Sequence, residues 1–498
     1  MPRLLAWAWL LAAGIACAGI AAVHIRWVLG HFSTDAYLLD SGWLAYLLES
    51  TDPLLKNPSS VNGLSFYAHH VSPHLFLFGA PFVWLLGLNG FEILAIHEAV
   101  FFGLFCAALL WGAYVNGEAL FQTLAFISAF AIGALSNILL QAAGYPHYEI
   151  ATLSLSALAL VAWDKGWRRL FLTCVIWLPL IREDGGFYTA FVSVASWVIA
   201  EPEKRTRDRR LLLAVFCGGI AVSAASMLFK SQVFRGFDAF QSNFSGQSWS
   251  HVSWQFAADR AYAAVTNPNI VPVLVGCCVL AVRDARYAGG LALLLPLFLL
   301  HLLSVRDEHG QFTLYFALPW LLPAVIWVLL FARRRQRGRA TLTEALTLVV
   351  LAVAMTAPAQ AAVGIPTHFG YVLPWSFERP ISDLEGMRRF ARSAHRTLGT
   401  DRPPGELACA SVGVAALIPN DLRPTDIVDP KAGIAECGTV LLMAGDMHST
   451  AIGAELDMRR FRKVAEFEAV QLWMRPDSAP GVTSGQAAND SSATARPR

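Results

Sequence analysis

Long apolar segments recur along the chain from Leu4 to about residue 362, and they restrict its fold more than any other feature. A run of about 20 apolar residues can satisfy its own backbone hydrogen bonds in lipid only as a helix. Hydrophobic residues make up 55% of the sequence and charged residues only 15%, which is typical of a helical membrane protein with many spans. A single soluble domain of this composition is not expected.

Short blocks of Lys and Arg separate the apolar segments and predict how they are oriented. The formal net charge is only +2, so the positive charge is concentrated in these blocks. The positive-inside rule places all of them in the cytoplasm. No soluble module surrounds them, and they give no support to nucleic-acid binding. The blocks lie at residues 165–169, 201–210, 283–286 and 333–339.

Together these features predict a mainly α fold, a polytopic transmembrane helical bundle. Residues 75–88 contain only about 14 apolar positions and include Pro81, which favours a re-entrant helix over a span. We predict about 11 spans, with the N-terminus in the cytoplasm. The spans lie at about residues 5–23, 93–115, 119–140, 149–163, 170–181, 186–200, 211–229, 270–283, 288–304, 312–332 and 340–362.

The first apolar segment has an alternative interpretation as a cleaved signal peptide. Ala16-Cys17-Ala18 resembles the small-residue pattern of a cleavage site. The apolar run is longer than the ~7 to 15 residues that such peptides usually contain, so we prefer a first span.

The composition changes after about residue 363, where charge, Pro and Gly increase. The chain is therefore divided into a transmembrane module over residues 1–363 and a small extracytoplasmic α/β domain over residues 364–476. Residues 477–498 are rich in Ser, Ala, Thr, Gly and Pro, and we expect a disordered tail there.

Short apolar runs predict the elements of this C-terminal domain. Residues 407–416 and 439–443 are predicted to be strands, and Met387 to Leu398 a helix. Cys409 and Cys437 could form a disulfide if the domain lies outside the cytoplasm.

The predicted topology brings several polar loops to the extracytoplasmic face, opposite the Lys and Arg blocks. The first loop, residues 24–73, is the longest of those that precede the basic blocks, and it contains acidic and imidazole groups. We expect any reactive site to be assembled from these loops. The others are residues 144–149, 182–186, 230–269 and 306–311.

Two acidic residues, Asp35 and Asp40, begin the polar part of the first loop close to the membrane. A carboxylate in apolar surroundings can act as a general base toward an acceptor hydroxyl. Asp40 is preferred as the catalytic residue, because Ser41-Gly42 leaves room beside it for a ligand. Asp35 is a second candidate, with helix capping as its alternative role.

Three imidazoles, His69, His70 and His74, lie around the end of the first loop. As imidazolium groups they could bind phosphate, and as neutral groups they could hold a divalent metal, although their spacing identifies no metal site. The alternative is that they fill the membrane interface without binding a ligand. Pro73 suits the first turn of the helix that follows.

Further candidates for substrate binding lie in two later loops. His147 and Glu149 lie on the loop that leads into one predicted span, and His309 and Gln311 precede another. His97-Glu98, inside a predicted span, is interpreted instead as a structural hydrogen-bonded pair between helices.

The triplet Arg182-Glu183-Asp184 separates two short apolar segments and should lie below the membrane surface. Placing ionisable groups at that depth costs free energy, so such groups are usually functional or paired with one another. Arg182 could neutralise a phosphate leaving group, with Glu183 or Asp184 orienting it or holding a metal. The alternative is a self-contained turn, in which Arg182 pairs with Asp184.

Four short motifs on the predicted outer face resemble those of the GT-C superfamily of membrane glycosyltransferases. The resemblance covers about residues 5–335, and within the superfamily it is nearest to a multi-pass family of bacteria and archaea known as a domain of unknown function. The motifs are Asp40-Ser41-Gly42-Trp43, His70-Val71-Ser72-Pro73, the pair His147 and Glu149, and Arg182-Glu183-Asp184.

This resemblance implies an inverting transfer of a sugar from a polyprenyl-phosphate donor to an envelope glycan, lipid or protein. It implies that the first-loop Asp is the base. Arg182 and the His cluster would then stabilise the lipid-phosphate leaving group. Whether a divalent metal is required is left open.

Two other functions compete with a glycosyltransferase. A transporter or flippase of lipid-linked substrates would use the same ionisable groups to line a path, but it predicts inverted repeats, and we find no repeat. A non-catalytic scaffold would present its outer domain to an envelope complex and would not need Asp40.

Overall fold

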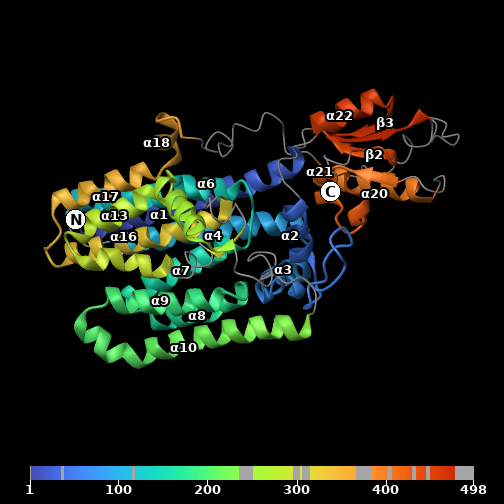
Figure 1. Ribbon diagram of the computed structural model, residues 1–498. Helices are drawn as coiled ribbons and strands as arrows, with labels where there is room; N and C mark the ends of the chain where they lie inside the picture. Colours follow the sequence, from blue (N-terminus) through green and yellow to red (C-terminus); the bar gives the residue numbers. More distant parts are fainter. Residues whose placement is uncertain are drawn as a thin grey trace. The chain divides into compact units, whose positions relative to one another are not determined.

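Helices form most of the chain's secondary structure, and one four-stranded sheet lies near the C-terminus (Figure 1). The computed structural model describes residues 2–34, 39–114, 118–234, 251–294, 303–305, 314–365, 383–400, 407–428, 433–444 and 449–476. The predictions of a mainly α polytopic fold and of a small C-terminal sheet are confirmed.

The chain forms two compact units. The first contains Met1–Gly30, Leu44–Asn57 and Leu64–Pro380, and the second contains His31–Trp43, Pro58–Gly63 and Ile381–Arg498.

Helices account for almost all of the described secondary structure before residue 380. Their bounds are α1 Pro2–Thr34, α2 Leu39–Glu49, η1 Phe66–Ala68, α3 Pro73–Leu86, α4 Gly90–Ala113, α5 Ala119–Leu135, α6 Asn137–Ala143, α7 Glu149–Asp164, α8 Arg168–Ile181, α9 Gly185–Ile199, α10 Pro202–Val233, α12 Trp254–Thr266, α13 Val271–Ala281, η3 Ala285–Gly290, η4 Leu314–Leu321, α16 Leu322–Gln336, α17 Leu342–Ala354 and α18 Ala357–Ala362.

Several of these helices are long and apolar enough to cross a membrane, which makes the chain a multi-pass membrane protein. Within the described ranges, four such segments are Trp7–Gly30, Gly90–Ala113, Pro202–Val233 and Tyr315–Gln336. A further pair, α12 and α13, is bent by 78°. The helix α3, at the predicted re-entrant segment, has 14 residues and contains Pro81. The total of about 11 spans stays a prediction.

Two segments predicted as continuous spans are interrupted. The first breaks at Ser136 between α5 and α6, and the second at Thr356 between α17 and α18. Thr356 has an extended backbone, and the two residues form an isolated antiparallel bridge with each other. The backbone N–H of Asn137 donates to the Met355 carbonyl at 2.9 Å, so the groups freed by one break are satisfied by the other.

A buried amide cluster joins these breaks to the bend between α12 and α13. The Asn137 side-chain amide donates to Asn269 at 3.0 Å and to Gln360 at 2.7 Å. The Asn269 amide in turn donates to Gln141 at 3.3 Å. Three interrupted helices are therefore held together by polar side chains inside the first unit.

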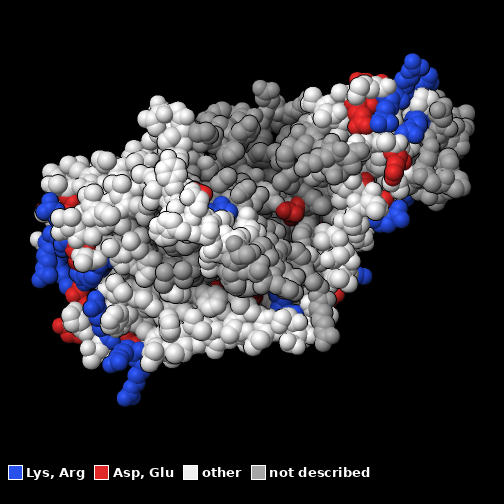
Figure 2. Space-filling model, viewed as in Figure 1, with Lys and Arg blue, Asp and Glu red and all other residues white. Residues whose placement is uncertain are grey.

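Ion pairs gather the Lys and Arg blocks at one end of the first unit. Arg333 pairs with Asp164, Arg168 with Asp208, and Arg286 and Arg337 both with Glu201. Figure 2 shows Lys and Arg concentrated over the helix ends at the left of the view. The start of α1 lies at the same end, because Trp9 contacts Tyr114, whose carbonyl accepts from Lys165.

The second unit is built on a sheet with the strand order β1-β2-β4-β3. The strands are β1 Leu407–Ala410, β2 Cys437–Met443, β3 Arg462–Phe467 and β4 Val470–Met474, and the helices are α20 Leu384–Thr400, α21 Val412–Leu417, η6 Pro424–Asp426 and α22 Ser449–Met458. The β1 and β2 strands are parallel, and the other pairs are antiparallel. The predicted helix at 387–398 corresponds to α20.

One strand prediction in this unit is partly wrong. Residues 407–416 form a strand only as far as Ala410, after which Ser411 starts the short helix α21. The Ser411 hydroxyl accepts a hydrogen bond from the Met443 N–H at 3.2 Å, which fixes the turn beside β2. The apolar run therefore continues as buried helix rather than as strand.

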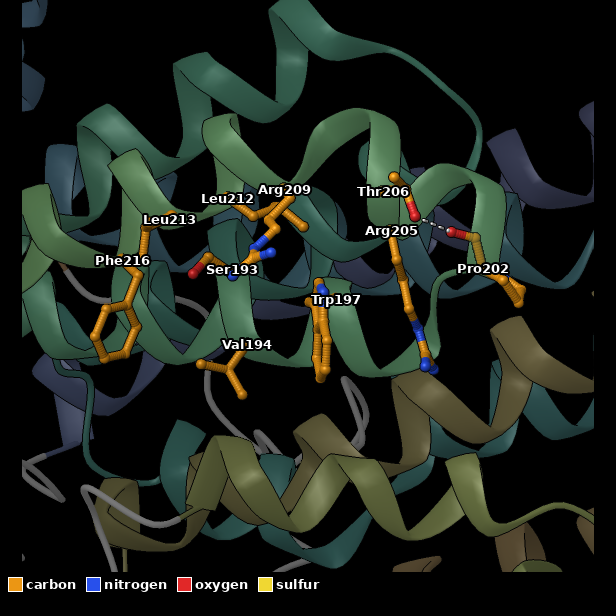
Figure 3. Close-up of a pocket in the computed structure, with 10 residues that line it drawn as sticks. All are labelled: Ser193, Val194, Trp197, Pro202, Arg205, Thr206, Arg209, Leu212, Leu213 and Phe216. Carbon is orange, nitrogen blue, oxygen red and sulfur yellow. Dashed lines mark hydrogen bonds between the residues drawn. The ribbon is translucent and has the colours of Figure 1, made fainter.

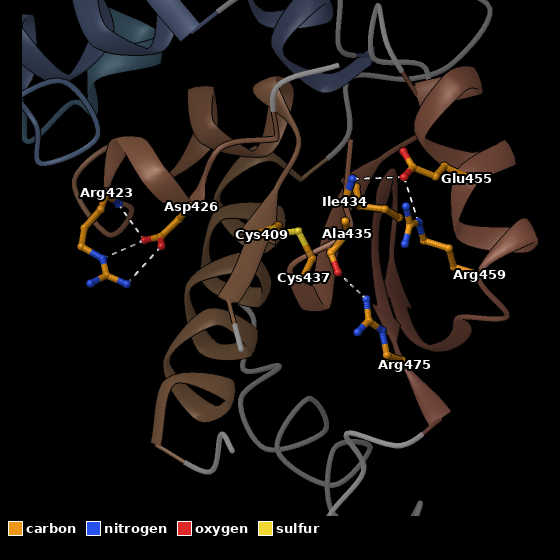
Figure 4. The surroundings of a disulfide bond; sticks show 9 residues. All are labelled: Cys409, Arg423, Asp426, Ile434, Ala435, Cys437, Glu455, Arg459 and Arg475. Carbon is orange, nitrogen blue, oxygen red and sulfur yellow. Dashed lines mark hydrogen bonds and ion pairs between the residues drawn. A yellow bond between two sulfur atoms is a disulfide. The ribbon is translucent and has the colours of Figure 1, made fainter. Parts of the chain in front are cut away.

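A disulfide joins Cys409 of β1 to Cys437 of β2 inside the apolar core of this unit (Figure 4). Polar contacts fix the surrounding loops, including one in which the Asp426 carboxylate accepts from the backbone N–H and the side chain of Arg423. Glu455 accepts from the Ile434 N–H at 3.2 Å and from Arg459 at 2.9 Å.

Candidate functional site

The triplet Arg182-Glu183-Asp184 forms the tight turn between α8 and α9. Arg182 leaves the helix with an extended backbone, at φ −160° and ψ 160°. A Cβ atom on Gly185 would lie 2.1 Å from the Leu178 carbonyl oxygen, so the turn requires glycine at this position. The opposite ends of α8 and α9, at Arg168 and Ile199, lie at the basic end of the unit. The triplet is about 20 Å away from that end by helix length.

Arg182 lies between two carboxylates. Its guanidinium pairs with Glu149, the first residue of α7, and with Asp184 at 3.2 Å. All three side chains are largely buried, with exposed fractions of 17–20%. The alternative interpretation of a turn in which Arg182 pairs with Asp184 is thus present, and Glu149 from a neighbouring helix is added to it.

Glu183 makes contacts separate from the Arg182 pairs and holds the end of the first loop. Its carboxylate accepts from the Val71 N–H at 3.1 Å, contacts the His70 ring at 3.1 Å and lies 3.5 Å from the Lys230 ammonium. Burial alone would raise the pKa of Glu183, but His70, Arg182 and Lys230 together hold it well below its usual range. Glu183 is therefore an anion that positions three segments.

Lys230, near the end of α10, belongs to this cluster and is not among the candidates that the sequence analysis names. Besides Glu183 it donates to the His69 carbonyl at 2.5 Å. The sequence did contain a signal: Lys230 follows the apolar run 211–229, at the opposite end from the basic block at 201–210. A cation at the end of a span that lies away from the basic block is unusual, and here it indicates the polar cluster.

The imidazoles of this cluster are held neutral. Burial is the main cause that lowers the pKa of His69, to about 4, and of His70. His147 stacks on Tyr315 with ring centres 3.9 Å apart and on Tyr148 at 4.3 Å. Burial, then Arg182 and His70, lower the pKa of His147 well below its ordinary value. These rings bind as neutral groups at pH 7.

His74 lies in a different, fully buried network. The Trp177 indole donates to His74 Nδ1 at 2.9 Å, His74 Nε2 meets His97 Nε2 at 3.0 Å, and His97 Nδ1 meets Glu98 at 3.3 Å. Because an indole can only donate, neutral His74 must carry its proton on Nε2 and donate to His97, which donates to Glu98. The predicted structural pair His97-Glu98 is thus part of a chain of hydrogen bonds that runs from α8 through α3 to α4.

The remaining candidates lie in the second unit or outside the described residues. Asp40 lies in the first turn of α2 with an exposed side chain, in the second unit. Asp35, His309 and Gln311 lie outside the described residues.

The cluster surrounds a cavity of only about 20 Å³, beside Glu149, Arg182, Asp184, Tyr188 and Tyr315. This is room for about one water molecule. Arg182 and Lys230 are the cations of this cluster, and Glu149, Glu183 and Asp184 are its carboxyl groups. Among the described residues, no group of three or more His, Cys, Asp or Glu is arranged to hold a metal ion.

Comparison with known proteins gives structural similarity only. No protein-family model and no curated protein matches the chain. The crystal structure of ArnT from Cupriavidus metallidurans bound to undecaprenyl phosphate is similar, with a TM-score of 0.46 and 11% identity over 94% of this chain and 99% of that one. The apo structure of the same protein also has a TM-score of 0.46, with 12% identity over 96% of this chain and 100% of that one. The cryo-EM structure of the arabinofuranosyltransferase AftD from Mycobacteria has a TM-score of 0.43, with 13% identity over 93% of this chain and 40% of that one.

Proposed function

We propose that this protein is a membrane glycosyltransferase that moves a sugar from a polyprenyl-phosphate donor to an envelope acceptor. The observation that supports it is the buried cluster of Arg182, Lys230 and three carboxylates at the helix ends remote from the Lys and Arg blocks. Ionisable groups at such a depth require a function or mutual pairing, and here three carboxyl groups meet two cations. A polyprenyl phosphate is of the class of lipid bound in one of the similar ArnT structures.

In the proposed reaction a carboxylate takes the proton of the acceptor hydroxyl as its oxygen bonds to the anomeric carbon. The bond from that carbon to the phosphate oxygen breaks, and the lipid phosphate leaves with the electron pair. Asp40, an exposed carboxylate in the first turn of α2, is the proposed base. Lys230 and Arg182 are proposed to stabilise the charge that develops on the phosphate.

Donor binding must rearrange the cluster, because a sugar is far larger than a cavity of about 20 Å³. We propose that the phosphate replaces a carboxylate beside Arg182, whose planar guanidinium suits both ligands. The carboxylates Glu149 and Asp184 would keep the cation in place until the donor arrives.

The test is release of polyprenyl phosphate from a panel of polyprenyl-phosphate sugars by the full chain in proteoliposomes. Asp40→Asn and Arg182→Ala should each lower the transfer rate by a factor of about 100 or more. Arg210→Ala, an exposed arginine in the basic block, is the matched control. Full activity in Asp40→Asn would remove Asp40 as the base, and full activity in both variants would contradict the proposed site.

We propose that this chemistry takes place on the extracytoplasmic face, with the N-terminus in the cytoplasm. The ion-paired basic blocks and the start of α1 share one end of the first unit, which the positive-inside rule assigns to the cytoplasm. The disulfide Cys409–Cys437 favours an oxidising compartment for the second unit. A cysteine placed at Arg210 should be labelled by a membrane-impermeant thiol reagent only from the cytoplasm.

A second candidate is a transporter or flippase of lipid-linked substrates. The observation that favours it is the amide cluster of Asn137, Asn269 and Gln360, where interrupted helices meet, since broken helices line substrate sites in many transporters. A flippase would move the lipid-linked sugar between leaflets without releasing polyprenyl phosphate. The same proteoliposome assay, read for both leaflets, separates the two functions.

A further inference from the structure

A groove of about 740 Å³ runs between α9 and α10 near the basic end of the first unit (Figure 3). Its walls come from Ser193, Val194 and Trp197 of α9, and from Pro202, Arg205, Thr206, Arg209, Leu212, Leu213 and Phe216 of α10. In Figure 3, Pro202 and Arg205 lie at one end of the groove, Phe216 and Val194 at the other, and Arg209 and Trp197 between them. The groove is therefore basic at one end and apolar at the other.

The sequence explains why the two helices separate here. At Gly186 and Gly219 their backbones touch, since a Cβ on either residue would lie 2.2–2.4 Å from the carbonyl oxygen of the other. Ser193 lies seven residues further along α9 and Phe216 three residues back along α10, so the groove opens on the Pro202 side of the close contact. Larger side chains replace glycine on that side and hold the helices apart.

The two arginines are available for an anion. Among the residues that the structure describes, no carboxylate pairs with Arg205 or Arg209, whereas the neighbouring Asp208 is already bound by Arg168 and Arg207. The Arg205 guanidinium lies over the Trp197 ring at 5.1 Å and donates to the Val198 carbonyl, and its buried Nε has no hydrogen-bond partner there. Arg209 is four residues further along α10, on the same helix face.

The apolar part of the groove lies where α10 enters the membrane. The block at 201–210 gives way to the uncharged run from Leu211 to Phe229. Leu213 is 57% exposed and Trp197 45% exposed, so the groove offers apolar surface to the surrounding lipid. An occupant must combine an anionic head with hydrocarbon chains.

We propose that this groove binds an anionic phospholipid of the leaflet that faces the basic blocks. Arg205 and Arg209 contact the phosphate, and one acyl chain lies along Leu212, Leu213 and Phe216. Basic pockets between membrane helices recognise anionic headgroups in this way, and guanidinium groups bind phosphate in two-pronged geometry. This site is at the end of the helices opposite the Arg182 cluster and serves a lipid that is not consumed.

The experiment is native mass spectrometry of the purified full chain, titrated with phosphatidylglycerol or with phosphatidylcholine of the same acyl chains. The wild type should bind phosphatidylglycerol more tightly. Arg205→Ala combined with Arg209→Ala should weaken that binding by roughly ten- to thirtyfold, since each basic residue near an anionic lipid contributes about a factor of five. Arg210→Ala, exposed on α10 but not in the groove, should leave it unchanged.

A second variant keeps the proposal testable if the double substitution does not fold. Val194→Trp fills the groove without changing its charge, and it should also abolish the preference for phosphatidylglycerol. The proposal is overturned if Val194→Trp binds as the wild type does, if phosphatidylcholine binds equally well, if millimolar inorganic phosphate displaces the lipid, or if the groove is found to be covered by a second copy of the chain.

Discussion

At the scale of single residues, Glu183 is the charge on which the polar cluster depends. It accepts from Val71, contacts His70 and faces Lys230, so it connects the first loop, the α8–α9 turn and the end of α10. Replacing it leaves a nearly buried ammonium without its carboxylate. The sequence singled out Glu183 as a ligand, but only the fold reveals that its partners are protein groups.

Glu183→Gln should destabilise the protein by about 2–3 kcal/mol, because Lys230 and the Val71 N–H lose a buried anionic acceptor. Thermal unfolding of the detergent-solubilised chain measures the effect as a lower Tm. Glu203→Gln, at an exposed position in the first turn of α10, is the matched control and should change little. Equal Tm values for the two variants would show that Glu183 does not hold these segments.

The neutral state of His69 predicts a pH dependence. The folded pKa of His69 is about 4, because the ring is partly buried and lies near His70 and Lys230. An unfolded His titrates near 6.5, so the unfolded chain binds more protons between these values. Stability should be full above about pH 6.5 and fall as the pH drops toward 4. The depressed pKa of Glu183 acts in the same direction, but only below its ordinary value near 4.3.

His69→Gln should make the Tm profile between pH 6.5 and 4.5 less steep, since the substituted side chain takes up no proton, while His70 and His147 still contribute to the slope. A profile as steep as that of the wild type would assign the pH dependence to other groups.

At the scale of helices, the contact of α9 with α10 depends on two glycines. Gly219→Val should weaken the pair by about 1–3 kcal/mol, because its Cβ would meet the Gly186 carbonyl at 2.4 Å. Gly218→Val is the matched control, as no atom lies within 4 Å of a Cβ there. A lower Tm for Gly219→Val alone is the expected result. An equal fall in Tm for the two variants would mean that the helix propensity of valine, and not the contact between α9 and α10, causes the destabilisation.

Helix positions were predictable from the sequence where long apolar runs define them, as for α4 and α10. The break at Ser136 was not, because it lies in an apolar and small-residue run without charge or Pro, whereas Pro358, two residues after Thr356, was a signal for the second break. The backbone polar groups that a break exposes in a buried segment are satisfied here by the pairing of the two breaks and by the amide cluster around Asn137. Such a feature depends on residues more than 200 positions apart.

At the scale of the whole molecule, the chain combines a helical membrane unit with a disulfide-bonded unit built on a sheet. Removing the disulfide by Cys409→Ser and Cys437→Ser should destabilise the second unit by about 3.5 kcal/mol, given the sequence separation of 28 residues. Limited proteolysis should then cut residues 383–476 faster. Cys217→Ser, an exposed free cysteine, is the control. Unchanged proteolysis would show that the core alone maintains this unit.

The candidate site could be predicted in part because the predicted topology places its loops on the same face. The sequence located Glu149, Arg182 and His70 on one face, and the structure brings them and Lys230 together. It could not reveal that Arg182 already has two carboxylate partners, since their approach depends on how α7 packs against the α8–α9 turn.

The most direct test is photo-crosslinking of the full chain in proteoliposomes with a polyprenyl phosphate that carries a photoreactive group beside the phosphate. Excess phosphatidylglycerol is present to occupy other anionic lipid sites. We predict that peptides containing His69–Val71, Glu149 and Arg182–Tyr188 are labelled, that unlabelled polyprenyl phosphate prevents this, and that Arg182→Ala and Lys230→Ala each reduce it. Labelling confined to the basic end, or labelling of the polar cluster that unlabelled lipid does not prevent, would contradict a donor site at these residues.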